Sequence, residues 1–237
     1  MLNTILFDLD GTLAPFMQDE FVHAYFKLLV QRLTPMGYDG EKLIQALWKG
    51  VAAMVQNSGE QTNRQVFWEV FTGELGIQAL ALESILDDFY TRDFDGARVV
   101  LRENVDRSAL IRSLREKGYG LVLATNPIFP ASAIETRLGW IGLAGSDFDY
   151  VTTYENSRRS KPNPGYYRDI LAQIGKEGEN CLMIGNNPVD DMAAREAGLE
   201  VYLVTDCIEN PDGLPVDGFP HGSFRELEAV LAKLPQI

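Results

Sequence analysis

The spacing of hydrophobic residues along the chain changes character twice. Ile5, Leu6 and Phe7 form a short apolar run that is typical of a buried strand and is interrupted at Asp8. Between about residues 16 and 92, apolar side chains recur at intervals of three and four, which predicts about four helices. Breaks between these helices are expected at Pro35, Met36 and Gly37, at Asn57, Ser58 and Gly59, and at Gly76.

From about residue 96 onward, short apolar runs alternate with segments of helical spacing. The predicted strands are 121–124, 150–152, 181–184 and 201–204, and the predicted helices lie near 104–117, 164–174, 190–197 and 223–233. Such alternation is typical of an α/β fold with a central parallel sheet. Because the first strand belongs to that sheet, the helical block must be an all-helical insertion. The Pro- and Gly-rich residues 210–222 are interpreted as an irregular segment.

Composition excludes several classes of protein. The 237 residues are 46% hydrophobic, which is enough for a full core. The net charge of −13 repels nucleic acid and anionic membranes, so neither is an expected partner. No signal peptide or membrane-spanning stretch is recognised, and a cytoplasmic location is expected. Cys181 and Cys207 form no CxxC pair, so both are predicted to be reduced structural thiols.

The first strand ends in two carboxylates, Asp8 and Asp10, which are followed by Gly11. In open α/β sheets, ligands bind beyond the carboxyl ends of the strands. Two like charges this close together require a cation or a role in proton transfer. The alternative is an ordinary Asp-Gly turn with solvated acids.

Three later segments also place polar groups after apolar strands or before helices. Thr125 and Asn126 offer a hydroxyl and a backbone N–H for phosphate, although such residues are also common in turns. Lys161 lies between stiff proline-containing dipeptides, which would aim its ammonium, but an incidental surface lysine is the alternative. Asp190 and Asp191 open a helix, where acids can simply complement the helix dipole.

The four segments, in this order, resemble the signature blocks of the haloacid dehalogenase superfamily of phosphohydrolases. The matching blocks are Asp8-Leu9-Asp10-Gly11-Thr12, Thr125-Asn126, Lys161-Pro162 and Gly185-Asn186-Asn187-Pro188-Val189-Asp190-Asp191. The resemblance implies a Rossmann-like core, at residues 1–15 and 96–237, with a helical cap domain inserted at residues 16–95.

The resemblance also implies a role for each candidate residue. Asp8 fits the nucleophile that forms an aspartyl-phosphate. Asp10 fits the general acid and base, and the presence of this second acid argues against a dehalogenase. Thr125, Asn126 and Lys161 would hold the phosphate oxygens, and Lys161 would also screen the charge of Asp8.

Mg²⁺ is the implied cofactor, bound by the Asp8 carboxylate, the Asp10 backbone carbonyl and the last acidic loop. The family usually has an aspartate where this chain has Asn186, which can coordinate through its carbonyl oxygen but carries no charge. The charged ligand is therefore expected to be Asp190 or Asp191, and the Mg²⁺ site is expected to be weakened.

The predicted function is an enzyme, a Mg²⁺-dependent phosphatase that hydrolyses a small phosphorylated metabolite. The alternatives are a sugar phosphomutase of the same superfamily and a non-catalytic binding protein on a degenerate core. The physiological substrate and the oligomeric state stay open. Candidate substrate contacts in the cap, each also explicable as structural, are Lys49, Arg64, Phe16, Trp48 and Trp68.

Overall fold

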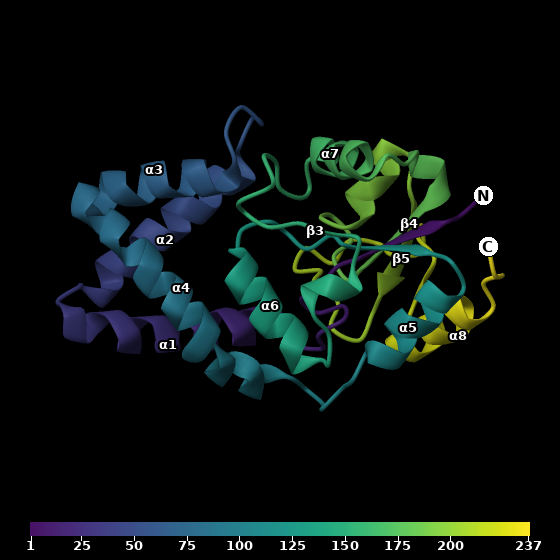
Figure 1. The fold of residues 1–237 in the computed structure, drawn as a ribbon, viewed down its shortest axis with the longest axis horizontal. Coiled ribbons are helices and arrows are strands. Elements are labelled where there is room, and N and C mark those ends of the chain that lie inside the picture. The colour runs from purple at the N-terminus through teal and green to yellow at the C-terminus, as the bar shows by residue number, and fades with distance from the viewer.

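The computed structural model describes residues 1–237 and contains a helix-covered sheet beside a block of helices (Figure 1). The strands are β1 (Thr4–Phe7), β2 (Gly120–Leu123), β3 (Tyr150–Val151), β4 (Cys181–Gly185), β5 (Glu200–Val204) and β6 (His221–Gly222). They form one six-stranded sheet in the order β3-β2-β1-β4-β5-β6, and every neighbouring pair is parallel. The predicted α/β fold with a central parallel sheet is confirmed, and β1 lies in the middle of that sheet.

Helices cover both faces of the sheet. The helices of the core are α5 (Ser108–Glu116), α6 (Ala131–Trp140), α7 (Pro164–Ile174) and α8 (Phe224–Ala232), with a 3₁₀ segment, η6 (Met192–Ala197). Ile5 and Phe7 pack in one hydrophobic cluster with residues of α5, α6 and α8. Leu6 points to the opposite face and packs with α7 and η6. The period-two alternation of β1 therefore decides which helices lie on which face.

Three elements differ from the sequence-based expectations. Helix α6 was not predicted, because Arg137 lies in the middle of its buried face and interrupts the apolar spacing. Residues 190–197 form only the short 3₁₀ segment η6 instead of an α-helix. The irregular segment 210–222 ends in β6, whose two residues are too few to give a recognisable strand pattern.

The inserted block consists of four α-helices, as predicted. They are α1 (Gln18–Leu33), α2 (Gly40–Val55), α3 (Asn63–Leu75) and α4 (Leu82–Arg92). Local capping fixes two of their starts: the Asp39 side chain accepts a hydrogen bond from the Lys42 N–H, and Thr62 forms a capping box with Gln65. A 3₁₀ segment, η3 (Phe94–Val100), leads back to the core. The division of the chain at residues 15/16 and 95/96 stays a prediction.

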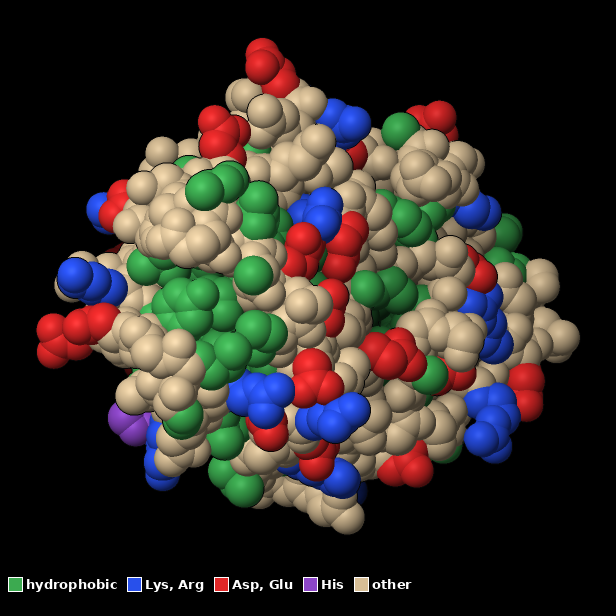
Figure 2. Space-filling model, turned by 60° about the vertical axis from the view of Figure 1, so that its left-hand side comes forward, with side chains coloured by type: hydrophobic (Ala, Val, Ile, Leu, Met, Phe, Trp, Pro, Cys, Tyr) green, Lys and Arg blue, Asp and Glu red, His purple; other side chains and the backbone are tan.

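An aromatic cluster joins the helical block to the core. The ring of Phe21 on α1 lies 5.0 Å from that of Phe16, 5.9 Å from that of Phe129 and 6.4 Å from that of Trp140 on α6. These residues belong to one continuous hydrophobic cluster with the residues of the sheet. In Figure 2, which turns the helical block forward, hydrophobic side chains also gather at the surface left of centre. The block is therefore packed firmly against the core, with α6 between them.

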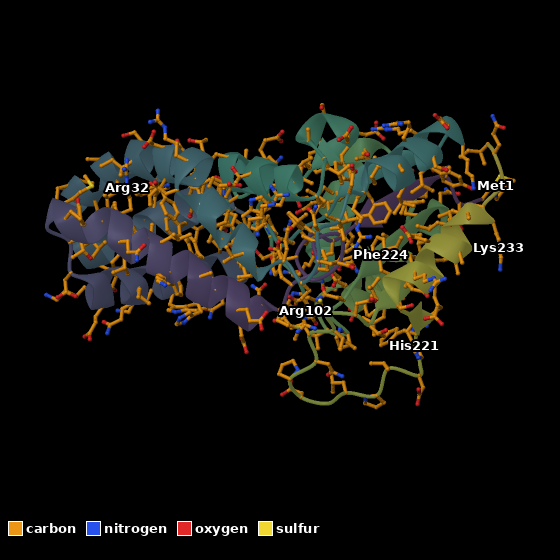
Figure 3. All side chains as sticks on the ribbon, turned by 90° about the horizontal axis from the view of Figure 1, so that it is seen from below. Met1, Arg32, Arg102, His221, Phe224 and Lys233 are labelled. Carbon is orange, nitrogen blue, oxygen red and sulfur yellow. The ribbon has the colours of Figure 1, made fainter.

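The two chain ends lie together at the end of the molecule away from the helical block. Figure 3 shows Met1 and Lys233 on the side opposite Arg32, and the segment that leads to His221 projects from the body. Both cysteines are free and buried. None of the helices combines the length and apolar character needed to cross a membrane.

Candidate active site

A cavity of about 240 Å³ lies at the carboxyl ends of β1, β2 and β4. Every candidate catalytic, phosphate-binding and metal-binding residue from the sequence lines it, although these residues come from segments far apart in the chain. The lining residues are Asp8, Asp10, Gln18, Val51, Val55, Thr125, Asn126, Ile128, Phe129, Lys161, Asn186, Asn187, Asp190, Asp191 and Glu209. The parallel sheet brings the segments together because all of its strands end at the same edge.

Asp8 follows β1 directly and is only 6% exposed. Its backbone N–H donates to the carbonyl oxygen of Ile184 on β4 over 2.8 Å, which continues the sheet by one residue. Its Oδ1 accepts from Lys161 Nζ (2.8 Å), and its Oδ2 accepts from the Thr12 hydroxyl (3.2 Å). Burial raises the pKa of Asp8 to about 7, and the charge of Lys161 opposes this rise. The hydrogen bonds from Lys161 and Thr12 fix the orientation of the carboxylate.

Lys161 is a buried cation between two carboxylates. Its side chain is 2% exposed, and its Nζ lies 2.8 Å from Asp8 Oδ1 and 2.6 Å from Asp191 Oδ1. Burial lowers the pKa of the Lys161 ammonium, but the charges of Asp191 and Asp8 outweigh this effect and hold the pKa well above its ordinary value. Lys161 is therefore charged and aimed into the cavity.

Asp10 lies in the turn after β1 and is paired with a residue that sequence reasoning missed. Its Oδ2 accepts from Arg137 Nη1, while its buried Oδ1 has no hydrogen-bond partner. The Arg137 side chain is fully buried, and its guanidinium carbon lies 4.4 Å from the Phe129 ring centroid. In the sequence, Arg137 is only a basic residue in the last turn of a helix, so no signal links it to Asp10.

The turn that carries Asp10 depends on Gly11. Gly11 has φ +77°, a left-handed conformation that glycine adopts without steric cost. A Cβ at this position would also lie 2.1 Å from Nδ2 of Asn186, so the two loops approach too closely for any side chain. Gly11 is thus required by the contact between the first and last loops of the site.

Thr125 and Asn126 follow β2 and border the cavity. The carbonyl oxygen of Thr125 accepts from the hydroxyls of Thr152 (2.7 Å) and Tyr166 (2.8 Å), which fixes the backbone of this loop. The backbone N–H of Asn126 donates to no atom of the chain, and the buried Oδ1 of its side chain has no partner. The loop therefore presents unused hydrogen-bonding groups beside Asp8.

The three candidate metal ligands in the loop after β4 differ in their hydrogen-bond partners. The Asn186 side chain accepts from the Thr12 hydroxyl (3.2 Å) and donates to the Cys207 carbonyl oxygen (2.6 Å). Asp191 accepts from Lys161 and, through its Oδ2, from the Asn187 N–H (2.9 Å). The Asp190 side chain makes no hydrogen bond or ion pair and lines the cavity, and burial raises its pKa.

Glu209 is a further carboxylate at the cavity that the sequence did not single out. It lies in the loop after β5, just before the irregular segment 210–222, and its backbone N–H donates to the Asn186 carbonyl oxygen over 3.0 Å. Burial and the charge of Asp190 raise the pKa of Glu209. No sequence pattern around Glu209 indicates its position, because only the return of the chain past β4 brings it to the site.

The cap residues proposed as substrate contacts divide into three groups. Lys49 and Arg64 pair with Glu74 and Glu83 on neighbouring cap helices, and neither basic residue lines the site. Phe16 is buried in the aromatic cluster and has a structural role. The two tryptophans, Trp48 and Trp68, line a second cavity between the cap and the core.

A buried polar network holds the cap against the loops of the site. Asn63 at the start of α3 is fully buried, and its Nδ2 donates to the Pro127 carbonyl oxygen (3.0 Å) and to Ser160 Oγ (3.1 Å). Its Oδ1 accepts from the side chain of Asn57 (2.8 Å). Pro127 follows Asn126 and Ser160 precedes Lys161, so one cap residue contacts both loops that border Asp8.

Comparison with solved structures shows the same fold at low sequence identity. A haloacid dehalogenase-superfamily (HAD) phosphatase from Thermococcus onnurineus superimposes with a TM-score of 0.62 at 17% identity, and each chain is covered over 100% of its length. L-2-haloacid dehalogenase from Xanthobacter autotrophicus gives a TM-score of 0.57 at 18% identity, with 99% of this chain and 100% of that chain covered. At these identities the likeness concerns the fold alone.

Sequence comparisons identify the family. A phosphoglycolate phosphatase from Aliivibrio fischeri is 28% identical over 205 residues, which cover 86% of this chain and 84% of that protein. A phosphoglycolate phosphatase from Rhodospirillum rubrum is 35% identical over 98 residues, only 41% of this chain and 39% of that protein. The family model for haloacid dehalogenase-like hydrolases matches residues 2–198. The four signature segments, their convergence on one cavity and this match together show that the chain belongs to the haloacid dehalogenase-like hydrolases.

Proposed function

We propose that this hydrolase is a Mg²⁺-dependent phosphatase that hydrolyses a small phosphorylated metabolite through an aspartyl-phosphate on Asp8. The observation that carries the proposal is the fixed carboxylate of Asp8, 2.8 Å from the buried ammonium of Lys161, in a cavity that also contains Asp10. Relatives named phosphoglycolate phosphatase and pyrophosphatase support the same reaction class.

In the first step, an Asp8 carboxylate oxygen attacks phosphorus in line with the leaving oxygen. The bond from phosphorus to the leaving oxygen breaks, and Asp10 donates its proton to that oxygen. Burial raises the pKa of Asp10 even though Arg137 opposes the rise, and an upward shift favours the protonated form that a general acid needs. Lys161, Thr125 and the Asn126 N–H are placed to stabilise the charge on the transferred phosphoryl oxygens.

In the second step, water attacks the aspartyl-phosphate and releases inorganic phosphate. Asp10, now ionised, accepts a proton from that water, and the Asp8 carboxylate is restored. Arg137 keeps Asp10 oriented through both steps, because the guanidinium is locked against Phe129. We therefore assign Arg137 a positioning role.

The site fits a divalent cation in charge and in ligand type. Five carboxylates line the cavity, but only Lys161 and Arg137 pair with any of them, and Asp10 Oδ1 is buried without a partner. No three acidic, His or Cys side chains form a preformed cluster. Mg²⁺ is commonly held by one or two carboxylates together with waters and substrate phosphate, so no such cluster is needed. When bound, Mg²⁺ would neutralise the carboxylates and the phosphate.

The ligands that fit are the Asp8 carboxylate, the Asp10 backbone carbonyl and Asp190, with Asn186 Oδ1 as a neutral ligand. Of the two acids in this loop, Asp190 is the freer, because its side chain makes no hydrogen bond or ion pair, whereas Asp191 accepts from Lys161 and the Asn187 N–H. Glu209 is a second acid at the same edge of the cavity.

Substitution of the two acids after β1 tests the covalent mechanism. Asp8→Asn should abolish phosphate release, and Asp10→Asn should lower kcat by about 10²- to 10⁴-fold, the range for a lost general acid or base. Release of inorganic phosphate without an added bisphosphate activator is the measurement, which also separates a phosphatase from a phosphomutase. Turnover by Asp8→Asn, with deamidation excluded by mass spectrometry, would rule out the mechanism.

Phosphoryl analogues test the role of Lys161. Beryllium fluoride with Mg²⁺ should bind at Asp8, and Lys161→Ala should weaken this binding by on the order of 10²-fold, because a buried cation beside the analogue is lost. Thermal shift and calorimetry measure the binding. Lys49→Met, which removes an exposed lysine outside the cavity, is the control and should bind as wild type does. Equal affinity in the two variants would refute a phosphate-binding role for Lys161.

Calorimetric titration with Mg²⁺ tests the assignment of the metal ligands. Asn186→Asp should tighten binding because a carboxylate replaces a neutral amide, and Asp190→Ala should weaken it by on the order of tenfold or more. Melting temperatures of the same variants report any loss of helix capping. If Glu209→Gln weakens Mg²⁺ binding more than Asp190→Ala does, the charged ligand is Glu209. If no variant shifts the binding constant, this loop does not hold the metal.

The buried pair of Asp10 and Arg137 has a consequence for stability. Arg137→Met should lower the free energy of unfolding by about 3–5 kcal/mol, the range for removing one partner of a buried ion pair. The loss should be larger at pH 8 than at pH 5. Burial raises the pKa of Asp10 in the folded protein above its pKa in the unfolded chain. As the pH rises above the unfolded pKa, ionisation of Asp10 therefore lowers the free energy of unfolding, and it does so more strongly when Arg137 is absent.

Chemical denaturation at the two pH values measures this effect. Lys49→Met removes an exposed ion pair with Glu74 and should cost only about 0–1 kcal/mol at both pH values. If Arg137→Met lowers the free energy of unfolding by the same amount at pH 5 and pH 8, ionisation of Asp10 is not coupled to Arg137.

A further inference from the structure

A second, apolar cavity of about 80 Å³ lies between the cap and the core. Thirteen of its seventeen lining residues are hydrophobic, and they come from all four cap helices and from core loops. Its walls include the aromatic or aliphatic side chains of Tyr25, Leu47, Phe67, Trp68, Leu86 and Tyr90. Most of these side chains also belong to the hydrophobic cluster that is continuous between the cap and the sheet, so the cavity is enclosed by well-packed residues of both parts.

The apolar cavity adjoins the catalytic cavity. Gln18, Val51, Ile128 and Phe129 line both, and they form the boundary between the two. Phe129 also stacks on the guanidinium of Arg137, which pairs with Asp10. A phosphate group at Asp8 would therefore have its leaving group directed past these four residues toward the apolar walls.

Neither cavity offers a cation for a second negative group on the substrate. No lysine or arginine lines the apolar cavity, and Lys161, the one that lines the catalytic cavity, is already paired with Asp8 and Asp191. Arg64 on α3 is already paired with Glu83 on α4, at a distance of 2.5 Å, and so is not free to bind a second negative group. Two carboxylates, Glu83 and Asp87, line the apolar cavity and would repel a further negative group. A carboxylate or second phosphate would be desolvated without compensation.

We infer that the substrate is a phosphate monoester with an uncharged, apolar alkyl or aryl leaving group, which is seated in the cavity between cap and core. This inference rests on the proposed phosphatase function and specifies its substrate class. It separates this chain from relatives named for phosphoglycolate or pyrophosphate, whose substrates carry a second anionic group.

A homologous series of primary alkyl phosphates tests the inference. Ethanol, butanol and hexanol, the leaving alcohols of the three esters, have nearly equal basicity. Differences in kcat/KM between ethyl, butyl and hexyl phosphate therefore report burial of the alkyl group of the substrate. We expect kcat/KM to rise by about fourfold per added methylene until the cavity is filled, which corresponds to about 0.8 kcal/mol per buried methylene. Phosphoglycolate, glycerol phosphate and pyrophosphate should all be poorer substrates than hexyl phosphate.

A pair of variants tests whether the rise of kcat/KM with alkyl length depends on the apolar cavity. Trp48 lines it from α2 and is 49% exposed, so Trp48→Ala is compatible with folding. This change should lower the ratio of kcat/KM for hexyl over ethyl phosphate by several-fold. Met36 is equally exposed at 49% but lies outside both cavities, so Met36→Ala should keep the wild-type ratio. Calorimetry with Asp8→Asn should show hexyl phosphate binding more tightly than ethyl phosphate, without turnover.

The possible failures can be told apart. If phosphoglycolate or pyrophosphate is hydrolysed best and the alkyl series is flat or falls with length, the apolar leaving group is refuted while the phosphatase function stands. The same conclusion follows if Trp48→Ala and Met36→Ala give equal ratios. If no ester or anhydride releases phosphate and beryllium fluoride does not bind with Mg²⁺, the proposed function itself fails, and the inference fails with it.

Discussion

The structure of the site depends on one buried cation shared by two buried carboxylates, Lys161 between Asp8 and Asp191. Removing water from three charged groups is costly, and only close mutual pairing offsets that cost. The three side chains come from the loop after β1, the segment between β3 and α7, and the loop after β4. Their pairing requires these segments to meet within hydrogen-bonding distance, which the parallel sheet achieves by ending its strands at one edge. The same pairing fixes the carboxylate of Asp8, the proposed nucleophile, and directs the ammonium of Lys161.

A second ion pair, between the buried Arg137 and the partly buried Asp10, links the site to the contact between core and cap. Arg137 on α6 reaches Asp10 on one side and is packed against the rings of Phe129 and Phe21 on the other. Asn63 on the cap adds hydrogen bonds to the loops that hold Asn126 and Lys161. Docking of the cap and arrangement of the candidate catalytic groups are thus linked by shared residues. Movement of the cap would disturb both the polar network and the aromatic cluster.

The two adjoining cavities have opposite character, and this contrast follows from where their walls originate. The strand ends provide polar and charged groups, because backbone groups and loop side chains there lack partners in the sheet. The cap helices provide apolar and aromatic side chains, because each helix buries one face against its neighbours. The proposed reaction at this junction would have its phosphoryl group on the polar side and its leaving group on the apolar side.

The sequence by itself determined the α/β class, the four-helix insertion and the residues at the strand ends, because each depends on local periodicity or on short motifs. Asp8, Asp10, Thr125, Asn126, Lys161 and the acidic loop were all found in this way, and all line one cavity. Helix α6, Arg137 and Glu209 were not found, because their importance arises from partners distant in the chain. Tertiary structure alone decided that Asp191 pairs with Lys161 while Asp190 lines the cavity without a partner, and that Lys49 and Arg64 bind cap acids. Neighbouring residues in a motif look alike in sequence, but burial and the direction of each side chain are set only when the loops of the sheet pack together.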